Sequence, residues 1–287
     1  MELTNEEILF LEEKAREIRL LILNTTYWAN GGHVGGALSV CDIAVSLYYK
    51  FLNIDTSNPS WEKRDRIIFS KGHAGILIAC ILADKGFINK EQLKTYNHTG
   101  SKLGMHLDKL KVPGLDASTG SLGHGFSIGA GIAAAAKYRN EKYKIFVILG
   151  DGECNEGSIW EAALFINHYC LSNLITIVDR NKLMYDGRTE EVMKIEPFKE
   201  KWESFGFNVL EIDGHNFKEL ALVFDRAINN NNKPTCIICN TVKGCGIAEI
   251  EGNYKSHYIS IKEKEVLEKY KKLINAYHDE RKKKWEN

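Results

Sequence analysis

Two segments of the chain decide its fold: Ile145-Phe146-Val147-Ile148-Leu149-Gly150-Asp151-Gly152 and Leu174-Ile175-Thr176-Ile177-Val178-Asp179-Arg180-Asn181. Each begins with an apolar, β-branched run that is typical of a buried strand, and each ends in polar residues. A helical pattern, Ser158 to Tyr169, separates them. Because a strand-helix-strand crossover is right-handed and joins parallel strands, the polar ends of both strands are expected at the same edge of one sheet.

The same pattern extends along the chain in both directions. Further strands are predicted at Ile67-Phe69, Val209-Ile212 and Cys236-Cys239, with helices at Phe126-Tyr138 and Phe217-Ile228. This alternation predicts an α/β fold with a doubly wound parallel sheet flanked by helices. We expect a single domain over residues 1–287, with a charged, helical tail on the surface from about residue 262.

The amino-terminal region is expected to be helical. Thr4 and Glu7 form a capping-box pattern, and apolar residues then recur at helical spacing. The glycine-rich stretch Asn30 to Gly36 should interrupt the helix, and a second helical stretch is predicted from Ser39 to about Phe51.

Composition excludes several classes of protein. With 38 basic and 38 acidic residues, the chain has no excess of positive charge, so we expect neither nucleic-acid nor membrane binding. Its 44% hydrophobic and 26% charged residues exclude disorder and fibrous structure. Seven scattered cysteines, an acidic amino terminus and the lack of a long apolar run predict a cytoplasmic protein.

Asp151 and Asn181 each follow a predicted strand and lie thirty positions apart. Neighbouring parallel strands would bring the two side chains together. A carboxylate and an amide oxygen are hard ligands that suit Mg²⁺ or Ca²⁺ and leave coordination positions for phosphate oxygens. Gly150 and Gly152 would let a diphosphate approach the backbone.

Four of the nine histidines, His33, His73, His106 and His257, lie in glycine-rich or polar loops. An imidazole titrates near neutral pH, which suits proton transfer to sugar hydroxyls and carbonyls. We therefore select these four as candidate catalytic residues. His98, His168 and His215 are interpreted as packed or surface residues.

The segment from Gly150 to Gly157, together with Asp179-Arg180-Asn181, resembles the cofactor-binding part of the transketolase family. The similarity is greatest to the amino-terminal subunit of split transketolases, in which two polypeptides share what is elsewhere one chain. Four other motifs occur in the order and spacing of that family: Gly32-His33-Val34-Gly35-Gly36, Ser70-Lys71-Gly72-His73-Ala74, Ser118-Thr119-Gly120-Ser121-Leu122-Gly123 and Thr241-Val242-Lys243-Gly244.

The resemblance implies two cofactors, thiamine diphosphate and Mg²⁺, with Ca²⁺ or Mn²⁺ as possible substitutes for Mg²⁺. It places the metal on Asp151, Asn181 and the carbonyl of Leu183. The other implied cofactor contacts are the diphosphate residues Gly152, His73 and His257, and the aminopyrimidine loop Gly120, Ser121 and Leu122.

The resemblance also assigns roles in proton transfer and in assembly. It places His33 and His257 where donor and acceptor oxygens change protonation, and His106 near the terminal hydroxyl of the donor. Glu156 resembles the residue that links the two active sites across the dimer.

The chain departs from the family pattern at three positions. Val34 stands where proline is usual, and His124 lies where glutamine is expected. Ser256-His257-Tyr258 replaces a tryptophan-histidine-glycine triplet, and the tyrosine would narrow the site or move its loop.

Thiamine catalysis also needs a carboxylate against the pyrimidine nitrogen. In the family, that glutamate lies in a separate pyrimidine-binding domain. We therefore expect a complementary polypeptide that carries the pyrimidine-binding and carboxy-terminal domains, in an α2β2 heterotetramer that acts on sugar phosphates. The expected reaction transfers a two-carbon ketol unit from a ketose phosphate to an aldose, in the pentose phosphate pathway or in a specialised biosynthesis.

Other interpretations of the sequence remain open. Within the thiamine enzymes they are a ketol or acyl transferase for an unusual sugar or a biosynthetic aldehyde, a 1-deoxyxylulose-5-phosphate synthase-like subunit, and the α subunit of a 2-oxo acid dehydrogenase. Gly129-Ala130-Gly131 weakly matches an NAD fingerprint. Cys236 and Cys239 have the spacing of a zinc knuckle, although in a strand their sulfurs would point to opposite faces.

Overall fold

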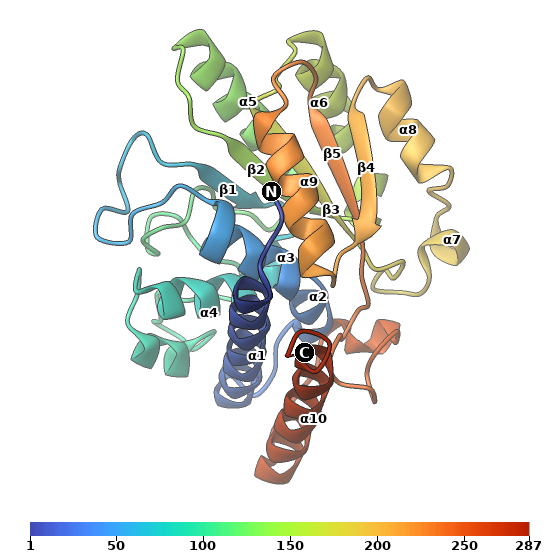
Figure 1. Ribbon diagram of the computed structural model, residues 1–287. Helices are drawn as coiled ribbons and strands as arrows, with labels where there is room; N and C mark the ends of the chain where they lie inside the picture. The colour runs from blue at the N-terminus through green and yellow to red at the C-terminus, as the bar shows by residue number, and fades with distance from the viewer. Residues whose placement is uncertain (287) are drawn as a thin grey trace.

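The computed structural model describes residues 1–286, and a five-stranded parallel sheet lies at its centre (Figure 1). The strands lie in the spatial order β1-β2-β3-β5-β4. All five strands predicted from the sequence are present, each one or two residues longer than predicted, and the doubly wound α/β fold is confirmed. Their bounds are β1 (Arg66–Phe69), β2 (Ile145–Gly150), β3 (Leu174–Arg180), β4 (Asn208–Asp213) and β5 (Thr235–Asn240).

Helices cover both faces of the sheet because the strands are apolar on both sides. Successive residues of β2 belong to different apolar clusters: Val147 packs in one, and Ile148 in the other. One face is covered by α5 (His124–Tyr138), α6 (Gly157–His168) and α8 (Phe198–Ser204). The opposite face is covered by α1 (Asn5–Trp28), α2 (Val34–Ser39), α3 (Cys41–Ser46), α4 (Gly75–Lys85), α9 (Phe217–Asn229) and α10 (Lys264–Lys282).

Parallel pairing brings several chain segments to the carboxyl edge of the sheet. Gly150 of β2 is in register with Asp179 of β3, and Arg180 of β3 is in register with Asn240 of β5. The residues that follow these strands therefore emerge side by side. This edge is where an open α/β sheet binds its ligands.

The glycine-rich stretch after α1 interrupts the helix, as predicted, but the interruption ends earlier than the predicted Gly36. Helix α2 begins at Val34, within the segment predicted to interrupt the helix, and Val40 separates it from α3. The glycines here serve close packing, because a Cβ on Gly35 would lie 2.4 Å from the Oγ of Ser256. Sequence spacing does not reveal this distant contact.

Helix α10, formed by the charged carboxy-terminal segment, packs along α1, and the two lie side by side in Figure 1. It buries Leu267, Ile274 and His278, so it is more than a surface helix. The capping box predicted at Thr4 and Glu7 is present at the start of α1. Among residues 1–286, no helix combines the length and apolar character needed to cross a membrane.

Candidate active site

A cavity of about 330 Å³ lies at the carboxyl edge of the sheet, above the ends of β2 and β3. Eight of the twelve candidate site residues selected from the sequence line this cavity. Those eight are His73, Gly120, Leu122, Asp151, Gly152, Asn181, Leu183 and His257.

The lining of this cavity includes Asp151, Asn181 and Leu183, which offer a carboxylate, an amide oxygen and a backbone carbonyl. Asp151 is only 2% exposed, and its Oδ1 accepts a hydrogen bond of 2.8 Å from the Gly152 N–H. The amide oxygen of Asn181 accepts from the Leu183 N–H at 3.1 Å. Burial, together with the neighbouring Asp179 carboxylate, raises the pKa of Asp151 to about 6. A divalent cation beside Asp151 would offset both effects, so the donor set fits Mg²⁺.

Two lysines in the cavity were missed by sequence reasoning. Lys71 forms a buried ion pair with Asp179 and donates to the carbonyl of Gly36 at 3.0 Å. Lys243, 3% exposed, contacts the carbonyls of Leu183 and Met184 at 3.2 and 3.0 Å. Burial and the charge of Lys71 lower the pKa of Lys243 to about 8.

Besides the two carbonyls, the Lys243 ammonium contacts Nδ1 of His257 at 3.2 Å, so all three of these contacts are to neutral groups. A buried ammonium with neutral partners is suited to an anionic ligand. Both lysines lie within the quoted motifs, Lys71 two residues after β1 and Lys243 three residues after β5, and this position was the available signal.

Glu153, also missed, ties three loops of the site together. Its carboxylate accepts from the N–H groups of Gly123 and Gly150 at 2.8 and 3.0 Å, and from the hydroxyl of Ser70. It is 3% exposed, and burial raises its pKa. The turn at Gly123 is thereby fixed relative to the end of β2.

The four selected histidines form one group. The ring centroids of His73 and His257 are 4.9 Å apart, and His33 lies 5.2 Å from His257 and 6.2 Å from His106. Burial lowers the pKa of His33 to about 4 and that of His257 to about 3, with further contributions from His106 and Lys243 respectively. These two rings are therefore neutral near pH 7, and each can donate a hydrogen bond from one ring nitrogen and accept one at the other.

Four selected residues do not line the cavity. His33 stands just outside it, and within the described chain its buried Nδ1 has no hydrogen-bond partner. His106, Ser121 and Glu156 are exposed. Glu156 precedes α6, near the turn at Gly123, so the structure gives it no contact with the cavity.

Tyr258 lies beside the cavity without closing it. Its ring is 5.4 Å from that of His33 and covers Gly31, where a Cβ would come 2.6 Å from the tyrosine hydroxyl. The side chain remains 43% exposed. The tyrosine ring therefore lies beside His33 and over Gly31.

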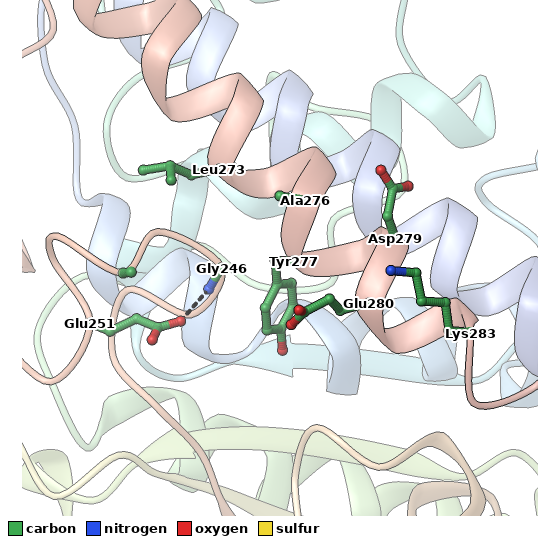
Figure 2. A pocket seen from close by; sticks show the side chains of 9 residues that line it. Gly246, Glu251, Leu273, Ala276, Tyr277, Asp279, Glu280 and Lys283 are labelled. Atoms are coloured by element: carbon green, nitrogen blue, oxygen red, sulfur yellow. Dashed lines mark hydrogen bonds between the residues drawn. The ribbon is translucent and has the colours of Figure 1, made fainter.

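A second cavity, of about 540 Å³, lies away from these residues (Figure 2). It separates α10 from the loop Gly246 to Glu251, and none of the selected residues lines it. In Figure 2, Tyr277 projects from α10 toward the loop. This cavity shares no residue with the cavity above β2 and β3.

Comparison with known proteins identifies the family. Residues 11–281 match the family described as "Transketolase, thiamine diphosphate binding domain". The chain belongs to the transketolase family. It is a thiamine diphosphate-binding transketolase domain, as the motifs predicted, and the NAD-binding interpretation is not favoured.

The most informative relatives are separate transketolase subunits. The chain is 41% identical to the 6-deoxy-6-sulfo-D-fructose transketolase subunit SqwG of Clostridium sp. strain MSTE9, over 90% of this chain and 94% of that protein. It is 44% identical to one of the subunits of the apulose-4-phosphate transketolase of Actinobacillus succinogenes, over 86% of this chain and 90% of that protein. These relatives confirm the resemblance to the amino-terminal subunit of split transketolases.

Solved transketolases share the fold over part of their length. The Campylobacter jejuni enzyme is 30% identical, with a TM-score of 0.82 over 96% of this chain and 47% of that chain. The Pichia stipitis enzyme in complex with sedoheptulose 7-phosphate is 28% identical, with a TM-score of 0.84 over 96% of this chain and 45% of that chain. This chain thus spans less than half of these longer polypeptides.

The structure also explains two other motifs of the sequence, the glycine motif Gly129-Ala130-Gly131 and the cysteine pair Cys236 and Cys239. A Cβ on Gly129 would lie 2.5 Å from Val147 of β2, so this glycine serves close packing of α5 on the sheet. Cys236 and Cys239 of β5 are buried in different apolar clusters, on opposite faces of the sheet. The opposite orientation predicted for their sulfurs is confirmed, and the two thiols cannot share a metal.

Proposed function

We propose that this chain is the pyrophosphate-binding subunit of a two-chain transketolase, and that residues 1–287 form one domain. The enzyme would transfer a two-carbon ketol unit from a ketose phosphate to an aldose acceptor. One observation carries the proposal: oxygen ligands from two adjacent strand ends and two buried lysines surround a single cavity. Bound thiamine diphosphate would supply the carbon nucleophile of the reaction.

The chain's own residues would bind and orient this cofactor. Asp151, Asn181 and the Leu183 carbonyl would hold Mg²⁺, for which Ca²⁺ or Mn²⁺ could substitute. Support comes from their common position in the cavity and from the burial of Asp151. Gly152, His73, His257 and the two lysines would contact the diphosphate, and Gly120, Ser121 and Leu122 the aminopyrimidine.

The histidines would move protons at the sugar. His33 and His257, neutral near pH 7, would accept or donate protons at hydroxyl and carbonyl oxygens of the substrates, with His106 at the outer end. Support comes from the contacts between their rings and from the unpartnered Nδ1 of His33.

A partner polypeptide would complete the site. Relatives of nearly the same length are named as transketolase subunits. Ile128 of α5, Leu164 and Phe165 of α6, and Tyr169 directly after α6 are exposed, and these apolar side chains are suited to assembly. We expect an α2β2 complex in which Glu156 communicates between the sites. All seven cysteines are free thiols, which supports a cytoplasmic location.

A second candidate function is the same transfer with a less common sugar. Two observations favour it. The two subunit relatives are named for 6-deoxy-6-sulfo-D-fructose and apulose 4-phosphate, and the ring of Tyr258 lies beside His33. The pentose phosphate pathway and a specialised sugar pathway are therefore both candidate settings.

The test uses the chain and its complementary polypeptide, purified separately. With thiamine diphosphate and Mg²⁺, the mixture should convert xylulose 5-phosphate and ribose 5-phosphate, or a pair from a panel of less common sugars. Each chain alone should be inactive. Turnover at ordinary enzyme rates by this chain alone would contradict the division of the site, and failure of this chain to bind the cofactor would contradict the function itself.

A further inference from the structure

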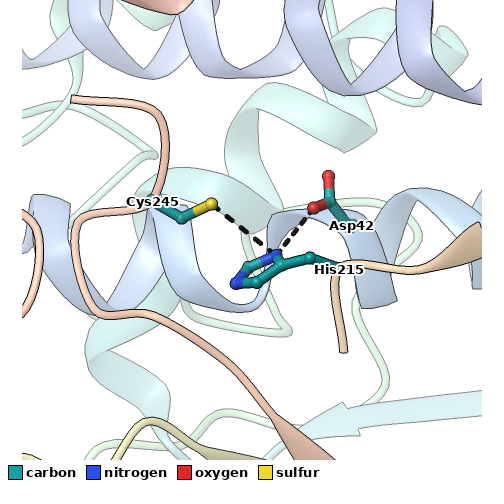
Figure 3. A group of neighbouring side chains, drawn as sticks. All are labelled: Asp42, His215 and Cys245. Atoms are coloured by element: carbon teal, nitrogen blue, oxygen red, sulfur yellow. Dashed lines mark hydrogen bonds and ion pairs between the residues drawn. The ribbon is translucent and has the colours of Figure 1, made fainter. Parts of the chain in front are cut away.

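Beside the cofactor cavity, Asp42, His215 and Cys245 meet in a buried cluster (Figure 3). His215, which follows β4, approaches Asp42 of α3 with its Nδ1 at 2.8 Å from Oδ2. The Sγ of Cys245 lies 3.6 Å from the same nitrogen. Asp42 is fully buried, and the side chain of His215 is 13% exposed.

The second ring nitrogen of His215 is also engaged. The backbone N–H of Val242 donates a hydrogen bond of 2.9 Å to Nε2. The Val242 N–H points at Nε2, so in this arrangement that nitrogen carries no proton and the proton on Nδ1 is donated to Asp42. Burial lowers the pKa of His215, but Cys245 and Asp42 raise it to about 10, so the bond to Val242 is what keeps a second proton off Nε2. The orientation of the imidazole is therefore fixed from both sides.

The arrangement does not suit a metal ion, although its three residue types can bind one. Asp42 already pairs with Arg19 at 2.6 Å and with Arg281 at 3.0 Å. A cation between these guanidinium groups would be repelled by both. The thiol of Cys245 also contacts the hydroxyl of Tyr277, at 3.0 Å.

The bond to Val242 matters because of the next residue. Lys243 projects into the cofactor cavity, where its contacts are the Leu183 and Met184 carbonyls and His257. On the other side of Val242, the hydroxyl of Thr241 bonds Asp179. The His215 bond fixes the backbone between these two contacts and so sets the direction from which Lys243 enters the cavity.

We propose that His215, oriented by Asp42, is a positioning residue that holds the Val242–Lys243 segment so that the Lys243 ammonium points at the diphosphate. The inference rests on the proposed function, since it assigns Lys243 a bound diphosphate. Arg281 of α10 extends the arrangement, because it donates to Asp42 and to the carbonyl of His215 at 2.7 Å. The carboxy-terminal helix thereby supports the site without touching it.

Two substitutions of His215 each retain one of the two hydrogen bonds of the imidazole and remove the other. His215→Gln can place an oxygen acceptor near the position of Nε2 and retain the bond to Val242. His215→Asn places its amide near the position of Nδ1, so it retains the bond to Asp42 and falls short of Val242. In titrations of the full chain with thiamine diphosphate and Mg²⁺, His215→Asn should raise the Kd about tenfold. His215→Gln should keep most of the wild-type affinity.

A double-mutant cycle separates positioning from a general loss of stability. Lys243→Met should weaken thiamine diphosphate binding about 30-fold, the equivalent of a charge-assisted bond. If His215 acts through Lys243, then His215→Asn with Lys243→Met should bind no more weakly than Lys243→Met alone. Additive losses would overturn the proposal, as would equal affinities of wild type and His215→Asn.

The controls keep the outcomes distinct. If the wild-type chain fails to bind thiamine diphosphate and Mg²⁺, the proposed function fails; if it binds and the His215 variants match it, only the positioning role fails. One measurement needs no substitution: the Val242 amide should exchange slowly with solvent in the wild-type chain. Exchange at the rate of an unprotected amide would contradict the bond on which the proposal depends.

Discussion

The chain contains two buried polar clusters that resemble each other in residue type and differ in how their charges are paired. The first, which we name the α1–α10 cluster, consists of Glu12, Arg19, Asp42, His278 and Arg281. Within it, Asp42 pairs with both arginines, and Glu12 accepts from Arg281 at 2.8 Å. The second is the cavity above the ends of β2 and β3, whose lining includes Asp151, Lys71 and Lys243.

Asp42 and Asp151 differ in pKa, whereas burial raises the pKa of Glu12 in the α1–α10 cluster to about 7. Burial opposes ionisation of Asp42, but Arg19 and Arg281 hold its pKa well below the usual range. Burial raises the pKa of Asp151 in the cavity to about 6. Asp42 is paired with two arginines, whereas Asp151 has one guanidinium, that of Arg180, at 3.6 Å. Lys243 contacts only neutral groups. The two clusters therefore differ in how closely their buried charges are paired, not in burial alone.

The largest expected effect tests the charge pairing in the α1–α10 cluster. Arg19→Met removes a fully buried guanidinium and leaves Asp42 with fewer positive partners. Breaking such a pair should reduce the free energy of unfolding by about 3 kcal/mol, measured by urea denaturation. Lys269→Met, which removes one partner of an exposed ion pair with Glu249, is the control and should change it by less than about 0.5 kcal/mol.

Stability and affinity for thiamine diphosphate should respond differently to substitutions in the two clusters. The folded Arg19→Met protein should lose far less affinity for thiamine diphosphate than a variant of the cavity. A loss of affinity without a loss of stability would contradict the assignment of Arg19 to a structural cluster.

The next effect concerns the cavity. Asp151→Ala should weaken Mg²⁺-dependent binding of thiamine diphosphate by about 100-fold, since a metal ligand is lost. The stability of the cofactor-free chain should be unchanged or higher, because a buried carboxylate with a raised pKa has been removed. Calorimetric titration and urea denaturation measure the two quantities. Asp279→Ala, at an exposed carboxylate of α10, is the matched control; undiminished binding by Asp151→Ala would remove the basis for the metal site.

The same comparison explains what could be predicted from the sequence. The strands, Asp151 and Asn181 were predictable because apolar runs and the polar residues after them are local signals. Lys71, Lys243 and Glu153 were missed because their partners come from distant loops. His215 was interpreted as a packed or surface residue for the same reason, since its partners lie on α3 and after β5. Sequence patterns locate the edge of the sheet, but not which loops meet there.

The smallest expected effect is a difference in pH dependence. Burial, with Lys243 nearby, lowers the pKa of His257 in the folded chain to about 3, against an unfolded value of about 6.5. Between these values the unfolded chain binds more protons, so His257 stabilises the fold fully above pH 6.5 and progressively less as the pH falls toward 3.

Replacing His257 should therefore flatten the pH dependence of stability. In urea denaturation at pH 7 and pH 5, His257→Asn should lose about 1 kcal/mol less than the wild type, roughly half of the full linkage value because solvent screens this partly exposed ring. Bound thiamine diphosphate should reduce the wild-type loss as well, because a nearby diphosphate favours the protonated imidazole. His278→Asn serves as the comparison: burial lowers the pKa of His278 to about 2, but it lies in the α1–α10 cluster. Its contribution should not respond to the cofactor, and an equal response at both histidines would mean that the two clusters are not electrostatically independent.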